Sequence, residues 1–381
     1  MIAEFKKTSR PQWAGAMLLL AVLACVVLTN AYVAKADFVF GEPTNLGPPV
    51  NSASVEANPV ISADNLELYF SSDRSGGYGG WDIWVTRRST KDDEWGTPMN
   101  LGPSINSSAH EAGTSIPEDG LELYFLSMRP GGYGAQDLWV ATRETIDDEW
   151  GTPTNLGPNV NTSGKEITPS ISPNGLELYF SDFTSPYRPG GCGGADIWFT
   201  TRPTKDDPWG EPVNLGPTVN SSSSERRPFI ANDGLMLFFD SERPGGYGQG
   251  DLYVTTRATL SDPWGTPVNL GPTVNSSAYE ELPSISADGS TLYFVSEDRP
   301  GGFGSCDIWQ VAILPVVDFN ADGIVDSADV CMMVDHWLTD EPLYDIAPLP
   351  YGDGIVDVKD LVLLAEHLTK VVEDPNEPDL P

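Results

Sequence analysis

The residues with the clearest chemical potential lie near the C-terminal end, in the segment DFNADGIVDSAD at residues 318–329. Its oxygen donors fall at positions 1, 3, 5, 7, 9 and 12 of a twelve-residue loop: Asp318, Asn320, Asp322, the backbone carbonyl of Ile324, Asp326 and Asp329. Gly323, at position 6, permits the sharp turn that such a loop needs. Ca²⁺ is a hard cation that prefers oxygen ligands, so this spacing predicts a calcium site.

A second segment, GDGIVDVKD at residues 352–360, repeats the end of this pattern. It places further candidate ligands at Asp353, Ile355, Asp357 and Asp360. Positions 1 and 3 of a twelve-residue loop would be Leu349 and Tyr351, neither of which carries a carboxylate or an amide. Either this site is incomplete or a longer loop supplies Asp345. The occupancy of the second site stays open.

Apolar residues at helical spacing follow each loop. They are Val330, Val334, Trp337 and Leu338 after the first loop, and Leu361, Leu364, Ala365 and Leu368 after the second. This periodicity predicts one amphipathic helix behind each loop, with no helix in front of either.

Two such loop–helix segments, with Asp in place of Glu at position 12, resemble a dockerin over residues 316–372. The resemblance implies calcium-dependent binding to a cohesin-bearing scaffold or surface protein. It also implies that positions 10 and 11 of each loop contact the partner, namely Ser327, Ala328, Val358 and Lys359. The acidic tail at residues 373–381 is expected to be disordered.

Charged residues also recur upstream, at one position in each of five repeated units. The columns are Glu56, Glu111, Glu166, Glu225 and Glu280; Arg74, Arg129, Arg188, Arg243 and Arg299; and Asp82, Asp137, Asp196, Asp251 and Asp307. A catalytic site is needed once, whereas a structural network is needed in every unit. Because buried charges are kept paired, these columns predict a scaffold.

Each unit reads as four short strands, such as PSIS, LELYF, DIWVTTR and WGTPVNLG. Packing such sheets radially buries both of their apolar faces. The fourth-strand phrase occurs first at residues 40–47, in front of any complete unit, and no further copy follows Trp309. The sequence therefore predicts an all-β, five-bladed propeller over residues 37–315, in which the N-terminal strand closes the last blade.

The repeated pattern IS-x-DG-x-x-LYF-x-S-x-RPGG, followed by DIW, is similar to the WD-like propeller repeat of the TolB type over most of residues 50–310. The resemblance implies a propeller but no single activity, because the family includes partner-binding modules.

A ligand surface is expected where the units differ. The loops entering the first strand and those between the second and third strands lie on one face of a propeller. Residues that vary there form the predicted surface: Trp81, His110, Lys165, Tyr187, Arg226 and Tyr279. Loops on a rigid scaffold are common binding sites, although ordinary surface variation also explains this set.

Residues 1–36 read as a signal peptide. Lys6, Lys7 and Arg10 precede an apolar run from Ala14 to Leu28, and Ala34-Lys35-Ala36 fits a cleavage site. The run is too short to cross a bilayer, so no transmembrane span is expected after cleavage. Lipidation at Cys25 is the alternative. The net charge of −34 disfavours binding to nucleic acid or to anionic membranes, and it suits a secreted, extracellular protein.

These features predict a secreted, non-catalytic propeller that binds a carbohydrate or protein and is tethered through its dockerin. One alternative is an extracellular polysaccharide-degrading enzyme, either a glycoside hydrolase or a lyase. Such an enzyme needs carboxylates that converge on the substrate and do not belong to the repeated columns. The sequence shows no set of three such acids. His110 is the only histidine in the propeller region and lies in no catalytic motif. A structural surface protein is the third reading.

Overall fold

The computed structural model describes residues 38–183, 187–314, 319, 327–339, 346 and 355–368. The predicted signal peptide, Cys25, the acidic tail and six predicted calcium ligands lie outside these residues. The six ligands are Asp318, Asn320, Asp322, Ile324, Asp326 and Asp353. Within the described part of the chain, no helix is long and apolar enough to cross a membrane.

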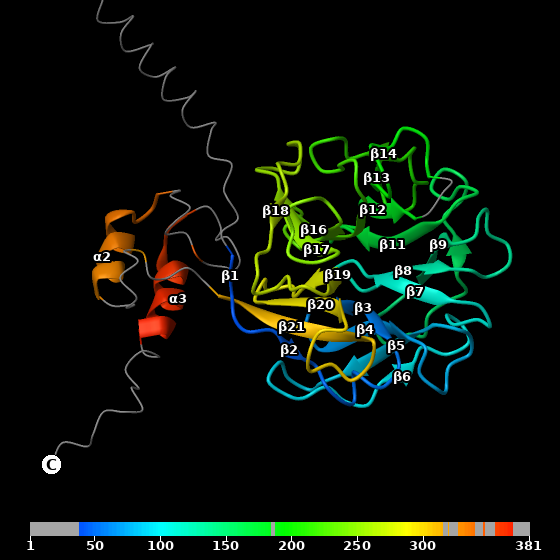
Figure 1. The fold of residues 1–381 in the computed structure, drawn as a ribbon, viewed down its shortest axis with the longest axis horizontal. Coiled ribbons are helices and arrows are strands. Elements are labelled where there is room, and N and C mark those ends of the chain that lie inside the picture. Colours follow the sequence, from blue (N-terminus) through cyan, green and yellow to red (C-terminus); the bar gives the residue numbers. More distant parts are fainter. Residues whose placement is uncertain are drawn as a thin grey trace, which may run out of the picture. The chain divides into compact units, whose positions relative to one another are not determined.

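The described strands form five antiparallel sheets (Figure 1). Blade 1 contains β3 (Glu56–Ile61), β4 (Glu67–Ser72), β5 (Asp82–Arg87) and β6 (Met99–Asn100). Blade 2 contains β7 (Glu111–Ser115), β8 (Glu122–Ser127), β9 (Asp137–Thr142) and β10 (Thr154–Asn155). Blade 3 contains β11 (Glu166–Ile171), β12 (Glu177–Asp182), β13 (Ile197–Thr201) and β14 (Val213–Asn214).

Blade 4 contains β15 (Glu225–Ile230), β16 (Met236–Ser241), β17 (Asp251–Thr256) and β18 (Val268–Asn269). Blade 5 contains β19 (Tyr279–Ile285), β20 (Thr291–Glu297) and β21 (Cys306–Leu314), completed by β1 (Val39–Phe40) and β2 (Thr44–Asn45). The first strand of each blade contacts the first strands of its two neighbours, so these five strands surround the centre. The predicted five-bladed propeller is confirmed.

The ring is closed by strands from both ends of the propeller. Thr44 pairs with Gln310 and Asn45 with Trp309, while Phe40 pairs with Ile313. This pairing confirms that the N-terminal copy of the repeated phrase belongs to the last blade. It also covers the outer edge of β21, which would otherwise be free to pair with another chain.

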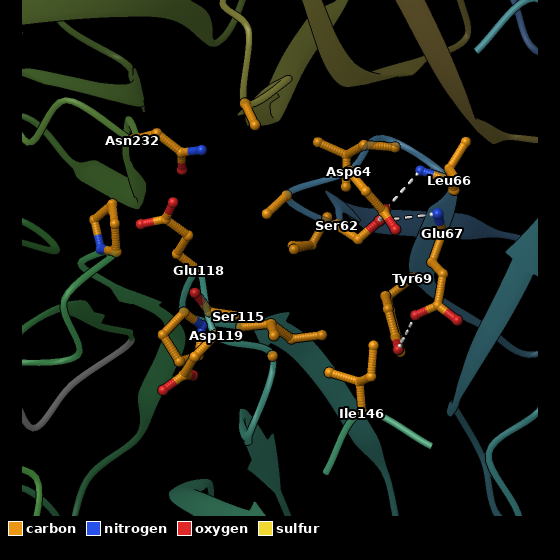
Figure 2. A pocket seen from close by; sticks show the side chains of 18 of the residues that line it. Ser62, Asp64, Leu66, Glu67, Tyr69, Ser115, Glu118, Asp119, Ile146 and Asn232 are labelled. Atoms are coloured by element: carbon orange, nitrogen blue, oxygen red, sulfur yellow. Dashed lines mark hydrogen bonds between the residues drawn. The ribbon is translucent and has the colours of Figure 1, made fainter. Parts of the chain in front are cut away.

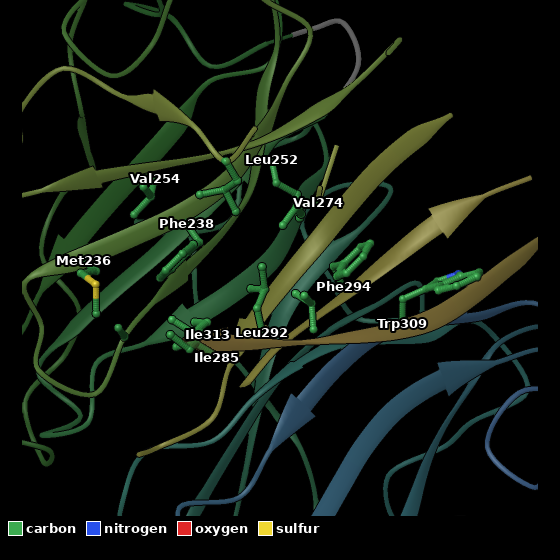
Figure 3. Packing of buried hydrophobic residues seen from close by; sticks show 13 residues of the cluster. Met236, Phe238, Leu252, Val254, Val274, Ile285, Leu292, Phe294, Trp309 and Ile313 are labelled. Atoms are coloured by element: carbon green, nitrogen blue, oxygen red, sulfur yellow. The ribbon is translucent and has the colours of Figure 1, made fainter. Parts of the chain in front are cut away.

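Apolar residues between blades 4 and 5 form one of the buried cores (Figure 3). Phe238, Leu252 and Phe294 are fully buried there, and Met236 and Ile313 nearly so. Phe38 and Phe40, from the N-terminal segment, pack against this cluster, and the Phe38 and Phe238 ring centroids lie 5.9 Å apart. The closing segment therefore adds apolar contacts as well as backbone hydrogen bonds.

Each innermost strand contains an irregularity at the same position. The residue there has a positive φ in every blade: Asn58, Gly113, Thr168, Arg227 and Leu282. The pairing with the second strand shifts at these residues, as in a β-bulge. Non-glycine residues seldom adopt this conformation, so the repeated fold imposes it on four different side chains.

Two helices are described in the C-terminal region, α2 (Ser327–Asp335) and α3 (Val358–Leu368). Their buried core consists of Phe319, Met333, Ile346, Val356 and Leu364. The predicted face of the first helix is partly wrong, because Val334 and Leu338 are 51% and 71% exposed. The helix ends at Asp335 and Leu338 has a φ of 60°, so helical spacing does not apply to Leu338, whereas Val334 lies within the helix on its exposed side.

Candidate functional site

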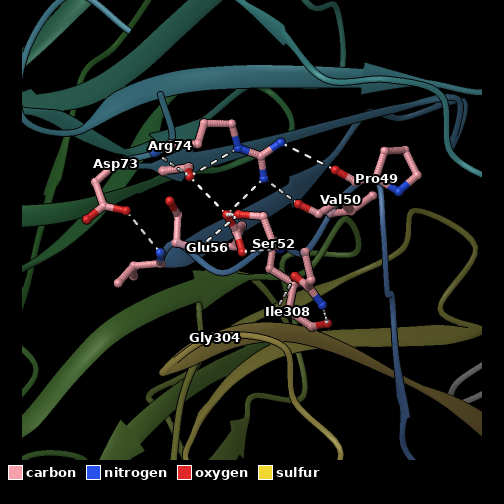
Figure 4. Close-up of polar contacts among 12 residues, drawn as sticks. Pro49, Val50, Ser52, Glu56, Asp73, Arg74, Gly304 and Ile308 are labelled. Atoms are coloured by element: carbon pink, nitrogen blue, oxygen red, sulfur yellow. Dashed lines mark hydrogen bonds and ion pairs between the residues drawn. The ribbon is translucent and has the colours of Figure 1, made fainter. Parts of the chain in front are cut away.

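The repeated Glu and Arg columns hold the loops between blades (Figure 4). Glu56 is fully buried, accepts hydrogen bonds from the Ser52 backbone and hydroxyl, and pairs with Arg74 at 2.9 Å. Arg74 also donates to the carbonyl of Val50. Since Val50 and Ser52 lie in the connection from blade 5 to blade 1, this network ties one blade to the next. The same ion pair recurs in each blade at 3.2–4.0 Å.

The repeated Asp column closes the glycine-rich loops. Asp82 accepts a hydrogen bond from the Gly79 backbone at 3.1 Å and from the Asn100 side chain at 2.9 Å. A Cβ atom on Gly77 would lie 2.1 Å from the Asp82 carboxylate, so only glycine fits there. These contacts confirm that the columns are scaffold.

The predicted ligand residues lie on one face, which we call the loop face. It comprises the loops that enter the five innermost strands and the loops between second and third strands. His110 is exposed, and its ring covers Gly80 so closely that a Cβ atom there would lie 2.6 Å away. Trp81 is half-buried beside it, with its carbonyl accepting from the Glu111 backbone at 2.9 Å. Tyr187 is 40% exposed.

The structure brings Lys165, Arg226 and Tyr279 together around Phe183. The Lys165 ammonium lies 5.7 Å from the centre of the Phe183 ring. The Arg226 guanidinium lies 5.8 Å from that ring and 5.7 Å from the Tyr279 ring. Arg226 also donates to the Tyr279 hydroxyl and, at 2.5 Å, to Glu242. Residues from blades 3, 4 and 5 thus form one polar and aromatic group, which we call the Arg226 group.

A buried ionic network supports the Arg226 group. Arg227 donates to Asp240 at 3.1 Å and to Glu281 at 2.7 Å through the same nitrogen. Arg226 contacts the same oxygen of Asp240, Oδ2, at 3.4 Å. Asp240 is fully buried and Glu281 is 5% exposed. Their positions fall outside the repeated columns, so this network exists once in the propeller.

Sequence reasoning missed this network, although a signal was available. Arg226 and Glu281 stand where Ala57, Ala112 and Ile167 stand in the other blades. Asp240 likewise replaces Ser71, Leu126, Ser181 and Val295. A repeat position that holds an apolar or small residue in some blades and a charged residue in another indicates a feature that only one blade has.

Burial controls the ionisation of these acids. Burial raises the pKa of Glu281 to about 7; Arg227 opposes this shift, whereas Asp240 and Glu297 add to it. Burial also raises the pKa of Asp240, against the attraction of Arg227 and Arg226. Burial lowers the pKa of Arg227, but Glu281 and Asp240 outweigh it and keep the guanidinium charged. Glu281 is therefore the group that takes up a proton near neutral pH.

At the level of the bulges, the centre of the propeller is nearly filled. A cavity of about 30 Å³ remains between the bulges, lined by Asn58, Thr168, Arg227 and Leu282 among others. That volume is comparable to one water molecule. Glycosidases place two carboxyl groups on either side of a sugar linkage. Asp240 and Glu281 instead share the Arg227 guanidinium.

In the C-terminal region the structure describes four of the ten predicted calcium ligands: Asp329, Ile355, Asp357 and Asp360. Asp329 is buried and accepts from the Phe319 backbone at 2.7 Å. Asp360 is buried in the same way and accepts from the Ile346 backbone at 2.6 Å. Among the described residues no group of three or more acids, histidines or cysteines could hold a metal.

Asp329 and Asp360 make matching contacts with residues earlier in the chain. Phe319 follows Asp318 in sequence, and Ile346 follows Asp345. The two contacts thus link the start of each helix to the residue that follows an aspartate in the sequence, Asp318 or Asp345. The predicted partner residues Ser327, Ala328, Val358 and Lys359 are exposed at the first turns of α2 and α3.

No family model and no curated protein matches the chain. Solved structures do match. A protein from Agrobacterium tumefaciens designated a TolB is 16% identical over 68% of this chain and 77% of that one, with a TM-score of 0.42. TolB from Acinetobacter baumannii is 13% identical over 67% and 54%, with a TM-score of 0.42. An α-L-arabinofuranosidase from Podospora anserina is 11% identical over 72% and 96%, with a TM-score of 0.46. Such values assign no activity, and the five-bladed architecture rests on the strand pairing itself.

Proposed function

We propose that this chain is a secreted binding protein, whose propeller presents a ligand surface and whose C-terminal region is a calcium-dependent dockerin. The Arg226 group is the observation that carries the first half of this proposal. It occurs once in a ring of otherwise repeated blades, and it gathers two aromatic rings, a guanidinium and an ammonium at one place on the loop face.

The chemistry of the Arg226 group suits a carbohydrate or a protein surface. Aromatic rings offer apolar faces with polar edges, and arginine offers several donors in a fixed plane. Asp240 and Glu242 hold Arg226 in position, so little side-chain entropy remains to be lost when a ligand binds. The surface is therefore ordered before the ligand arrives.

The dockerin half rests on the paired loop ends. The residues that would hold Ca²⁺ are the first-loop ligands Asp318, Asn320, Asp322, Ile324, Asp326 and Asp329, with Asp353, Ile355, Asp357 and Asp360 in the second loop. Bound calcium would neutralise the crowded carboxylates and fix each loop. Asp329 and Asp360 are both buried and accept from the Phe319 and Ile346 backbones, which supports equivalent roles for these two position-12 residues.

The outer surface of the C-terminal helices fits a docking role. Val358 and Val362 on α3 and Ile355 before it are 61%, 55% and 49% exposed. These apolar side chains lie beside the predicted partner residue Lys359. A cohesin-bearing scaffold or surface protein is the proposed partner, and export through residues 1–36 places the complex outside the cell.

Two assays test the proposed function on the intact mature chain. The wild-type protein, Arg226→Ala and the surface control Glu149→Ala are each applied to a glycan array. The wild type and Glu149→Ala should bind the same glycans, and Arg226→Ala should lose this binding. Immobilised cohesins should retain the protein in calcium and release it in chelator. A chain that binds no glycan and no extracellular protein through the loop face would contradict the first half, and calcium-independent retention would contradict the second.

Enzymatic activity is a second candidate because Glu281 has the ionisation of a general acid. Its near-complete burial and its pairing with Arg227 argue against contact with a substrate. We therefore expect no release of reducing sugar from plant or algal polysaccharides. Release that disappears in Glu281→Gln, with the fold intact, would establish the enzyme instead.

A further inference from the structure

A pocket lies on the face opposite the loop face. This turn face comprises the turns between first and second strands, at residues 62–66, 117–121, 172–176, 231–235 and 286–290. The pocket has a volume of about 390 Å³, which is in the range of small-ligand sites. Most of its wall comes from blades 1 and 2, so it follows the seam between them (Figure 2).

Lysine side chains cross two of the other seams. Lys91, in the loop between the third and fourth strands of blade 1, reaches the turn of blade 5 and donates to Asp288 at 2.6 Å. Lys205, at the equivalent position in blade 3, reaches the turn of blade 2 and donates to Asp119. We call this contact the lysine clasp. In each case the aliphatic stem spans the seam and the ammonium meets a turn carboxylate.

The seam between blades 1 and 2 lacks this lysine. Ile146 stands at the position of Lys91 and Lys205, and it is 65% exposed. The acceptor that a clasp would use is nevertheless present, because Asp64 occupies the same turn position as Asp119 and Asp288. Both Ile146 and Asp64 line the pocket (Figure 2).

The two oxygens of Asp64 and Asp288 correspond closely. Oδ1 of Asp288 accepts from the Ser286 hydroxyl at 2.7 Å, and Oδ1 of Asp64 accepts from the Ser62 hydroxyl at 2.6 Å. Oδ2 of Asp288 receives Lys91. Oδ2 of Asp64 has no hydrogen-bond partner among the described residues. One acceptor oxygen is therefore oriented by its turn and left open toward the pocket.

We propose that this pocket binds an alkylammonium group, and that its natural occupant is a lysine side chain of a partner polypeptide. The protein's own clasps show how such a side chain fits a seam. The ammonium would donate to Oδ2 of Asp64, and the methylene stem would lie along Ile146. This site is independent of the loop face and of the dockerin.

The rest of the pocket fits the same occupant. Its floor is formed by isoleucines at the ends of the five innermost strands: Ile61, Ile116, Ile171, Ile230 and Ile285. Glu118 and Asn232 face the cavity from the side opposite Asp64 (Figure 2). They offer acceptors for the backbone N–H groups that flank a lysine in a polypeptide. A free diamine has no such groups, so we assign the pocket to a polypeptide.

The three arginines of the pocket already have partners, and Arg88 donates to the Asn65 carbonyl at 2.9 Å and lies 4.3 Å from the Trp95 ring centre. Arg143 donates to the carbonyls of Gly120 and Ile146 and lies 4.2 Å from the Trp150 ring centre. Arg87 pairs with Glu67 at 2.6 Å. Asp64 and Glu118, by contrast, have no ion pair within the described part of the chain. Asp147 also lines the pocket without an ion pair, so three unpaired carboxylates face two guanidinium groups, Arg88 and Arg143, that have no carboxylate partner among the described residues. The excess charge of the pocket is therefore negative, which favours a cationic ligand.

The test uses the mature chain and a blocked peptide, acetyl-Ala-Lys-Ala-amide, observed by saturation-transfer NMR. The matched peptide with norleucine in place of lysine keeps the stem and removes the charge. We expect the lysine peptide to bind at millimolar concentration or tighter and the norleucine peptide not to bind. Asp64→Asn should weaken the affinity for the lysine peptide about tenfold, as loss of one charge-assisted hydrogen bond predicts. Asp288→Asn, at the equivalent turn, should leave the affinity unchanged.

A second variant occupies the pocket from within. Ile146→Lys should form the missing clasp with Asp64 and abolish peptide binding. Leu260→Lys, at the same position in blade 4, faces Asn174 rather than an aspartate and should not affect binding. Equal binding of both peptides, or retention of affinity in Ile146→Lys and Asp64→Asn, would overturn the proposal. Tighter binding of 1,5-diaminopentane than of the lysine peptide would reject the polypeptide source.

Discussion

Replacing Glu281 with glutamine should change the pH dependence of stability in a defined direction. Glutamine resembles the protonated carboxylic acid, so it can still contact Arg227 without adding a negative charge to the buried network. The folded pKa of Glu281 is about 7, above the ordinary value of 4.5. Between these pH values the folded protein holds a proton that the unfolded chain has released.

The sign and size of the effect follow from linkage. A group whose folded pKa is raised stabilises the fold below its unfolded pKa, and this contribution is lost as pH rises toward the folded pKa. A shift of roughly 2.5 units corresponds to about 3 kcal/mol, because each unit is worth 1.36 kcal/mol. The wild type should therefore lose up to about 3 kcal/mol between pH 4.5 and pH 7 through this group alone. Glu281→Gln should not.

Urea denaturation followed by tryptophan fluorescence, at pH 5 and at pH 8, measures the difference. We expect nearly equal unfolding free energies at pH 5 and a more stable Glu281→Gln protein at pH 8. Glu149→Gln, at an exposed position, corrects for all groups that titrate equally in both proteins. A constant difference between wild type and Glu281→Gln at the two pH values would refute the assigned ionisation of the network.

Three further predictions concern the ring and the C-terminal region. Removing residues 38–47 exposes the edge of β21 and takes Phe38 and Phe40 from their core, so the melting temperature in calorimetry should fall by at least about 5 °C; an unchanged value would contradict closure by this strand. Adding calcium to the chelated full chain should increase helical circular dichroism, and Asp318→Ala should remove most of that increase; a spectrum that ignores chelator would contradict the calcium loops. Ser327-Ala328 and Val358-Lys359 differ in size and charge, so exchanging only one pair should weaken binding to a cognate cohesin about 5- to 30-fold; two silent single exchanges would indicate two binding orientations.

Much of the propeller follows from the sequence because the chain repeats it. The isolated phrase at residues 40–47 has no unit of its own, so closure by the N-terminal strand was predictable and is confirmed by the pairing of Asn45 with Trp309. The scaffold columns were likewise predictable, since a group such as Glu56 recurs in every blade. Because the blades repeat, the residue at each position of one blade can be compared with its equivalents in the other four.

The Arg226 group was only partly predictable. Variation at the loop entrances indicated Lys165, Arg226 and Tyr279, but contact between them depends on how three blades meet. Arg227 reaches Asp240 and Glu281 from a bulge with a φ of 55°, a local geometry that no strand periodicity reveals. Leu338 was wrongly assigned to the buried face of the first C-terminal helix because periodicity does not show where a short helix ends, and Val334, within that helix, is exposed.

The lysine clasp shows why a repeat protein can change one seam without losing its fold. Lys91 and Asp288 are both more than one-third exposed, and a surface ion pair of this kind contributes between 0 and about 1 kcal/mol. Removing one partner of the buried network around Glu56 would cost more, because it would leave an unpaired buried charge, and this network is retained in every blade. Replacing the clasp lysine by Ile146 therefore costs little, while it leaves Asp64 open and a cavity beside it. A substitution at a seam that costs little stability and leaves an oriented, unpaired group is therefore one from which a binding site can evolve.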